Sequence, residues 1–163
     1  MKTLIDWKRA ALRALLALAV LWAGAVGAAE SLDAFPTTTA QISTASGTQQ
    51  FKIWVADTPA RSEQGLMFVH GLAHDKGMLF PADNSGQMAM WMKNTLIPLD
   101  MLFIDRSGEI IFIQHEAKPN SEAIIRIPAP VVTPVAAVLE LAGGECAKRH
   151  IVQGDRLSVA QPK

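Results

Sequence analysis

The stretch MLFIDRSGEIIFIQH, residues 101–115, predicts a β-hairpin at the centre of the fold. Residues 101–104 are apolar at every position, which is typical of a strand that is buried on both faces. Residues 105–108 are turn formers and end in a glycine, at the position where a hairpin turn favours a positive φ. Residues 109–115 then return as the partner strand. A strand buried on both faces indicates that a larger sheet continues beyond the hairpin.

Further short strands are predicted on both sides of this hairpin. The patterns of apolar residues place them at 51–55, 78–80, 87–92, 123–127, 135–141 and 156–160. Short helices are expected at 59–67, where Thr58 can cap a helix that begins at Pro59, and at 145–149. The spacing of these elements does not fit βαβ units. We therefore expect a mainly β fold, a single compact antiparallel β-sandwich or barrel with two short helices, over residues 49–161.

The N-terminal region has the layout of a secretory signal peptide. Basic residues precede an uncharged stretch, 14–29, whose 16 residues are fewer than the roughly 20 that span a bilayer. We expect a cleaved signal peptide over residues 1–29, with cleavage after Ala28 or Ala29, and export to the periplasm or the cell exterior. An uncleaved signal anchor is the alternative, and it would be the only membrane contact. Residues 30–48 are rich in Thr, Ser, Ala and Gln and are expected to form a flexible linker, with a loosely attached first strand as the alternative.

The charge of the chain argues against nucleic-acid binding. Of its 15 basic and 15 acidic residues, 4 basic and 1 acidic precede Glu30, which leaves 11 basic and 14 acidic residues and a formal net charge of −3. We expect no nucleic-acid partner, because such a partner requires a basic stripe. Cys146 is the only cysteine, so the exported domain must be held by its core without an internal disulfide.

A polar triplet interrupts the apolar pattern shortly before the central hairpin. Lys93, Asn94 and Thr95 closely follow Trp91, and Asp100 begins the next strand. A turn held by its own polar side chains is the simpler interpretation of these residues. The functional interpretation is a small polar pocket beside the apolar wall of Trp91.

Three methionines, Met88, Met90 and Met92, alternate in the same region. Thioether sulfur suits Cu(I), which exported copper proteins bind in this way. Alternation is also typical of any core-facing strand, and methionine commonly fills irregular cores. We therefore expect these side chains in the core and no metal site, with Cu(I) binding as the alternative. The four histidines add no recognisable ligand motif.

Six short motifs occur along the chain: GLMF (65–68), GMLF (77–80), WMKNT (91–95), PLDMLFID (98–105), VLEL (138–141) and GD (154–155). Their order and approximate spacing resemble those of the domain of unknown function 192 family of bacteria and archaea. The resemblance covers about residues 49–160. It implies a compact, mainly β single domain that is often exported, and it implies no established reaction, substrate or cofactor.

The family pattern concentrates polar identity on a few positions of this sequence. They match Trp91, Lys93, Asn94, Thr95, Asp100, Glu140 and Asp155. Glu140 interrupts an otherwise apolar strand, so its carboxylate must face solvent, pair with a cation or lie in a cleft. We expect Lys93, Asn94, Asp100 and Glu140 to converge on one concave patch beside Trp91.

The expected function is a non-catalytic exported binding module for a small polar ligand or a peptide of an envelope partner. The sequence contains no GxSxG, HExxH, Walker or CxxC motif, and no cofactor is expected. The first alternative is an envelope hydrolase or lyase in which Asp100 and Glu140 act as an acid–base pair, helped by Lys93. The second alternative is a periplasmic Cu(I)-binding protein that uses Met88, Met90 and Met92.

Overall fold

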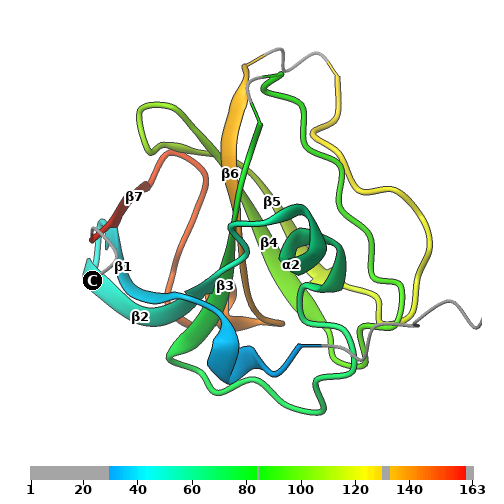
Figure 1. Ribbon diagram of the computed structural model, residues 1–163. Helices are drawn as coiled ribbons and strands as arrows, with labels where there is room; N and C mark the ends of the chain where they lie inside the picture. The colour runs from blue at the N-terminus through cyan, green and yellow to red at the C-terminus, as the bar shows by residue number, and fades with distance from the viewer. Residues whose placement is uncertain (1–29, 84, 130–132, 161–163) are drawn as a thin grey trace, which may run out of the picture.

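The computed structural model describes residues 30–83, 85–129 and 133–160 (Figure 1). A seven-stranded sheet has the order β5-β4-β6-β3-β2-β1-β7. Its strands are β1 (Thr37–Thr44), β2 (Gly47–Val55), β3 (Lys76–Pro81), β4 (Leu99–Asp105), β5 (Ile110–Ala117), β6 (Val135–Ala142) and β7 (Arg156–Val159). The helices are the 3-10 helix η1 (Leu32–Ala34) and the α-helices α2 (Pro59–Gln64) and α3 (Glu145–Lys148). The prediction of a mainly β fold with two short α-helices is confirmed.

The central hairpin forms as predicted. β4 lies between β5 and β6 and is buried from Leu99 to Ile104, as a strand without a solvent face must be. Gly108 takes the positive φ that the turn requires, 85°. The Asp105 carboxylate accepts hydrogen bonds from the backbone N–H groups of Ser107 and Glu109, at 2.8 and 2.9 Å. Turn chemistry within a few residues therefore accounts for this hairpin.

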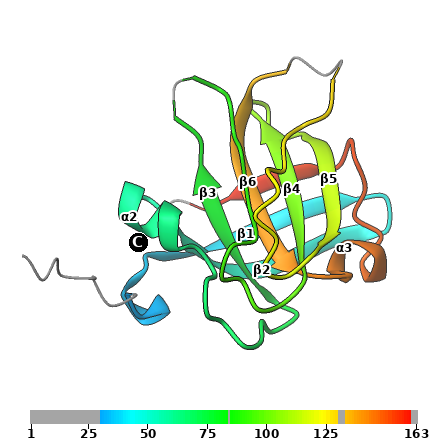
Figure 2. The same ribbon diagram turned by 90° about the vertical axis from the view of Figure 1, so that its right-hand side faces the viewer.

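The sheet is mixed and curls into a half-barrel. β2 and β3 pair in parallel, because the connection through α2 brings the chain back to the same end of the sheet, and the other pairs are antiparallel. Figure 2 shows β1 and β2 running across the direction of β4, β5 and β6. The two edges of the sheet meet at one end, where Leu157 N–H donates to Gly108 O at 2.7 Å and Ile110 N–H to Asp155 O at 2.9 Å.

Three predicted segments differ from the structure. The expected linker, 30–48, contains all of β1 and the start of β2, so the expectation of a flexible linker is wrong. Only Ala40 and Ile42 of β1 face the core, so the sequence shows little apolar alternation there. The surrounding threonines are typical of a linker, although their β-branched side chains also favour a strand. The expected strands 87–92 and 123–127 are irregular and share only the isolated bridge between Met90 and Ile125. The expected signal peptide, residues 1–29, lies outside the described residues.

Alternate residues of β3, β4 and β6 face two different hydrophobic clusters. The α2-side cluster contains strand residues Met78, Phe80, Leu99, Met101, Phe103 and Val138, with Leu66, Met90 and Met92 from the connections. The α3-side cluster contains strand residues Leu79, Leu102, Ile104, Leu139 and Leu141, with Cys146 and Ile151 from α3 and beyond. None of the helices in the described part of the chain has the length and hydrophobicity of a transmembrane segment.

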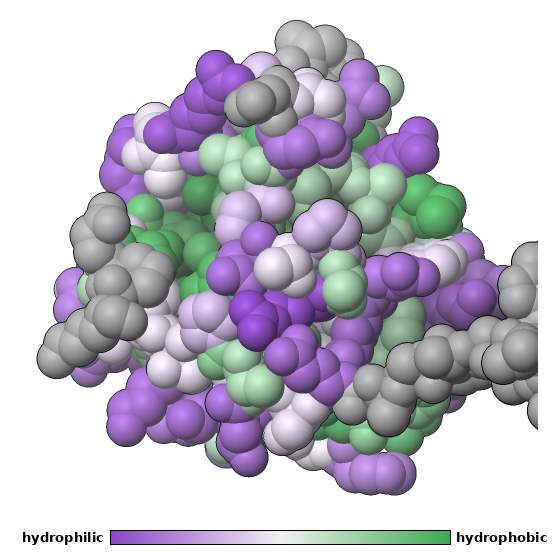
Figure 3. Space-filling model, in the orientation of Figure 1, coloured by the Kyte–Doolittle hydropathy of each residue, from purple (hydrophilic) through white to green (hydrophobic). Residues whose placement is uncertain are grey.

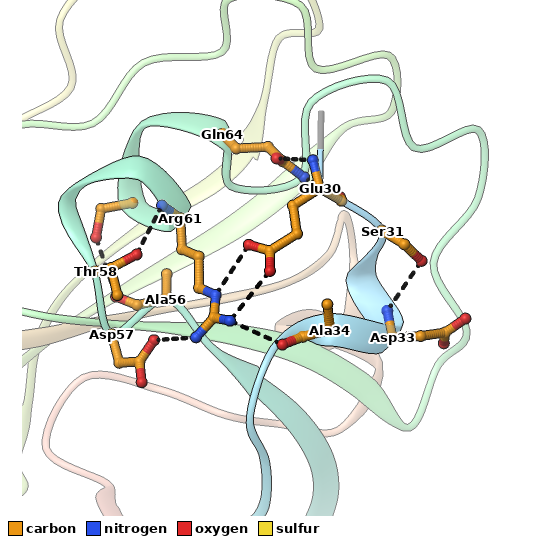
Figure 4. Close-up of polar contacts among 10 residues, drawn as sticks. Glu30, Ser31, Asp33, Ala34, Ala56, Asp57, Thr58, Arg61 and Gln64 are labelled. Atoms are coloured by element: carbon orange, nitrogen blue, oxygen red, sulfur yellow. Dashed lines mark hydrogen bonds and ion pairs between the residues drawn. The ribbon is translucent and has the colours of Figure 1, made fainter. Parts of the chain in front are cut away.

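Arg61 fastens the N-terminal segment of the described chain to α2 (Figure 4). Its guanidinium donates to Glu30 Oε2 at 3.1 Å, to Asp57 Oδ1 at 2.7 Å and to the Ala34 carbonyl at 2.9 Å. Gln64 adds a reciprocal pair, because its amide accepts from Glu30 N–H and donates to Glu30 O, both at 2.6 Å. The start of the described chain therefore has a defined place against α2.

Candidate functional site

The helix α2 with its exit, the connection from β3 to β4 and the sheet leave a narrow cleft on the α2 side of the sheet. The connection from β3 to β4 and the one from β5 to β6 run side by side (Figure 1), joined by hydrogen bonds of 2.9 and 2.8 Å between Met90 and Ile125. The residues that line the cleft come from α2 and its exit, from the first connection and from the sheet: Ser62, Glu63, Gln64, Gly65, Leu66, Met67, Phe80, Met90, Trp91, Lys93, Thr95 and Glu140. We call this feature the Glu140 cleft.

Glu140 supplies a buried carboxyl group to the cleft. In β6 it lies in register between Met78 of β3 and Met101 of β4, both fully buried, and its side chain is 4% exposed. It makes no hydrogen bond or ion pair with any residue in the described ranges. In the described residues, every polar side-chain atom that is fully buried has a hydrogen-bond partner. Because the Glu140 oxygens have no such partner, they must be accessible from the open space of the cleft. Burial raises the pKa of Glu140 to about 8.

The open space at the Glu140 carboxyl is small. Its volume of about 20 Å³ is enough for a single water-sized group. We call this open space of the Glu140 cleft the slot. One wall is the chain from Ser62 to Met67, which forms the end of α2 and its exit. The second wall is formed by Met90, Trp91, Lys93 and Thr95 of the connection from β3 to β4. The face that carries α2 mixes hydrophilic surface with exposed hydrophobic surface (Figure 3).

Trp91 and Lys93 form the solvent-facing part of this second wall. Trp91 is 37% exposed, and the Lys93 ammonium nitrogen lies 5.2 Å from the centroid of its ring. A cation at this distance over an indole face is attracted by the ring quadrupole. Lys93 has no ion-pair partner among the residues that the structure describes. The rim therefore combines the ammonium group of a flexible lysine side chain with an aromatic ring that this ammonium already contacts.

Asn94 and Thr95 hold the turn that carries this wall. Asn94 has a φ of 55°, and its carbonyl accepts from Phe68 N–H at 2.9 Å. Phe68 itself has a φ of 63° and is 55% exposed, an uncommon backbone conformation for a bulky residue. Thr95 is buried, and its N–H donates to Met92 O at 3.1 Å. The simpler interpretation of the polar triplet agrees with this turn, and Lys93 and Thr95 also line the cleft.

The structure does not bring Asp100 to this cleft. Asp100 is opposite Leu141 in the sheet and so faces the α3 side, whereas Glu140 is opposite Met101 and faces the α2 side. Its carboxylate is fully buried and accepts from the backbone N–H groups of Glu116 and Cys146, at 2.9 and 2.8 Å. The expectation that Asp100 and Glu140 share one patch, as an acid–base pair would require, is corrected. Asp100 ties the end of β5 and the start of α3 to β4.

The three alternating methionines are divided between the core and its edge. Met90 and Met92 are buried in the α2-side cluster, and Met88 is half-buried at its margin. The expected core placement agrees with this burial for Met90 and Met92. Alternation alone did not predict a strand, because residues 87–92 reach the core as an irregular segment with a single bridge.

A third buried carboxylate, Glu145, was missed by the sequence interpretation. Glu145 of α3 is 3% exposed and accepts from Arg149 Nε at 2.9 Å, from Lys148 Nζ at 3.4 Å and from the exposed His74 ring at 2.6 Å. Burial by itself raises the pKa of Glu145, but the hydrogen bonds from Arg149, His74 and Lys148 outweigh it and lower that pKa. The i,i+3 and i,i+4 spacing to Lys148 and Arg149 was the available signal. All its partners are intramolecular, so this group has a structural role.

Two solved structures resemble this chain over most of its length. A proposed transcription regulator from Sinorhizobium meliloti 1021 is 41% identical, with a TM-score of 0.69 over 77% of this chain and 95% of that one. A protein of unknown function from Novosphingobium aromaticivorans DSM 12444 is 30% identical, with a TM-score of 0.71 over 80% of this chain and 91% of that one. No match was found among curated proteins. A family model described as "Uncharacterized ACR" matches residues 41–159, and the chain therefore belongs to the domain of unknown function 192 (DUF192) family.

Proposed function

We propose that this protein is an exported binding module that takes a small polar ligand at the Glu140 cleft. The observation that carries the proposal is the Glu140 carboxyl, which is buried, open to the slot and unpartnered among the described residues. Burying such a group without a partner costs free energy, and sequences tolerate that cost mainly where the group has a function. Trp91 and Lys93 at the rim add an aromatic face and a charge for orienting a ligand.

The N-terminal contacts are consistent with the proposed export. Cleavage after Ala28 or Ala29 leaves Glu30 in the mature chain, and with it the contacts to Arg61 and Gln64 (Figure 4). Export is tested by expressing the full chain in a bacterium, fractionating the cells and determining the N-terminus of the product by mass spectrometry. We expect Ala29 or Glu30 at the N-terminus of a periplasmic or secreted product. A product that keeps residues 1–29 in the membrane or the cytoplasm would contradict it.

A role in DNA binding is not part of the proposal. The Sinorhizobium meliloti protein is described as a proposed transcription regulator. Here residues 30–163 carry 11 basic and 14 acidic side chains, a net charge of −3, which repels a phosphate backbone. A chain with this charge is better suited to a small ligand than to a nucleic acid.

Ligand binding is tested by NMR on protein expressed from the full chain and purified as the cell processes it. Amines, amides, carboxylates and sugars are added separately, and backbone amide shifts are followed. We expect at least one of these classes to shift signals of both cleft walls, residues 62–67 and 91–95, in a saturable manner. Glu140→Gln should alter that response, whereas Glu122→Gln, an exposed carboxylate outside the cleft, should not. The absence of a saturable response to every class would refute the proposed function.

A further inference from the structure

The buried Glu140 carboxyl offers hydrogen-bond acceptors to the slot. Met78 and Met101 lie beside Glu140 on the neighbouring strands, and neither methionine can donate a hydrogen bond. A ligand that fills the slot must therefore satisfy this carboxyl itself. Hydrogen bonds between an ionised acceptor and a charged donor are about twice as strong as neutral ones, so a cationic donor gains most.

The charges around the slot also favour a cation. The charged groups that line it are Glu140 from β6, Glu63 from α2 and Lys93 from the second wall. Above the pKa of Glu140, about 8, the lining carries two carboxylates and one ammonium and so has a net negative charge. The Lys93 ammonium lies over the Trp91 ring and makes no ion pair with the described residues, so the rim already accommodates an ammonium of the chain itself. An anionic ligand would meet the carboxylates instead.

The shape of the slot restricts the cation. A volume of about 20 Å³ matches a group of the size of a water molecule, such as an ammonium head, whereas a planar guanidinium and a quaternary ammonium are larger than this volume. The flanking side chains of Phe80, Met90 and Trp91 are apolar and suit methylene groups that continue outward. A head of this size on a thin apolar stem describes an unbranched primary amine.

We propose that the Glu140 cleft binds a primary ammonium group on an unbranched aliphatic chain, which donates to Glu140 and displaces Lys93 from Trp91. This inference rests on the proposed binding function and specifies its ligand class. A free alkylamine and the side chain of a peptide lysine share this chemistry. They differ beyond the aliphatic stem, since only the peptide continues across the rim.

The test is an NMR titration of protein expressed from the full chain, with n-butylammonium, n-butanol, butyrate and tetramethylammonium as probes. The Trp91 indole N–H and the Glu140 side-chain carbon report binding. We expect saturable shifts at both with n-butylammonium alone. Glu140→Gln should weaken this binding at least about tenfold, and Lys93→Met should tighten it about threefold, because a competing internal cation is removed. Glu122→Gln should leave it unchanged.

The unmodified protein provides a test that needs no substitution. Binding of n-butylammonium should tighten by roughly tenfold or more from pH 6 to pH 8.5, as Glu140 ionises while the amine stays charged. Titration with 1,5-diaminopentane and with a blocked Gly-Lys-Gly peptide then distinguishes the sources, and tighter binding of one identifies it. Saturable binding of butanol, butyrate or tetramethylammonium in place of n-butylammonium would overturn this inference and leave the proposed function standing. If neither these probes nor the amines, amides, carboxylates and sugars that test the proposed function bound the protein, both this inference and the proposed function would be overturned.

Discussion

The sharpest prediction concerns the stability of the Glu140→Gln variant as a function of pH. Burial raises the pKa of Glu140 from 4.5 to about 8, so between these values the folded protein binds a proton that the unfolded chain releases. The free energy of unfolding must therefore fall as the pH rises from 4.5 through 8, and the loss is complete above 8. At 1.36 kcal/mol for each tenfold change in proton affinity, the full effect is about 5 kcal/mol. Solvent that enters the slot should reduce it, so we expect about 3–5 kcal/mol.

Glutamine keeps the shape of the side chain and cannot ionise. We expect Glu140→Gln to have nearly the stability of the unmodified protein at pH 5 and to exceed it by about 3–5 kcal/mol at pH 9. Urea unfolding followed by tryptophan fluorescence at pH 5, 7 and 9 measures the difference, with Glu122→Gln as the control. The other titrating groups are common to all three proteins, so only the difference between their pH profiles matters. If the Glu140→Gln and unmodified profiles were parallel from pH 5 to pH 9, the buried, unpartnered carboxyl on which the site rests would be refuted.

Three further predictions concern the framework of the site. Asp100→Ala leaves two backbone N–H groups without their acceptor and should lower the free energy of unfolding by about 2–4 kcal/mol in urea titrations, and a loss below 1 kcal/mol would contradict its structural role. Gly77→Ala places a methyl group 2.6 Å from the Glu140 carbonyl oxygen, so we expect a loss of about 2–3 kcal/mol, whereas unchanged stability would show that the backbone there can yield. Arg61→Leu should accelerate amide hydrogen exchange at residues 30–35 without affecting the central hairpin, and equal exchange rates would show that other contacts hold Glu30.

The local sequence pattern was sufficient to predict an element when the interactions that form it lie within a few residues. The hairpin from β4 to β5 follows from an apolar run, an Asp and Ser turn and a glycine at positive φ, all within residues 99–117. The start of α2 is similar, because Thr58 accepts from Arg61 N–H at 3.2 Å and Pro59 begins the helix. Such features depend on residues that are neighbours in sequence, so they can be predicted from the sequence alone. β1 was expected only as the alternative to a linker, because a strand between two others can be rich in threonine when only one of its faces meets the core.

The candidate site required the tertiary structure. The sequence and its resemblance to the DUF192 family singled out Trp91, Lys93, Asn94, Thr95 and Glu140, and all of these except Asn94 line one cleft. It places Asp100 on the opposite side of the sheet, because a strand alternates its faces and the register of β4 against β6 decides which carboxylate meets which side. The helix α2 carried no signal of its own, since nothing in PARSEQ predicts where it will pack, whereas its exit belongs to the GLMF motif.

By itself, the sequence determined the mainly β class, the central hairpin and the start of α2, and its resemblance to the DUF192 family indicated the positions of polar identity. Only the tertiary structure decided the curl of the sheet, the parallel pairing of β2 with β3 and the set of side chains around Glu140. The physical reason is the range of the interactions. Turns, caps and burial periodicity are set over a few residues, whereas register and the packing of distant connections depend on the whole core.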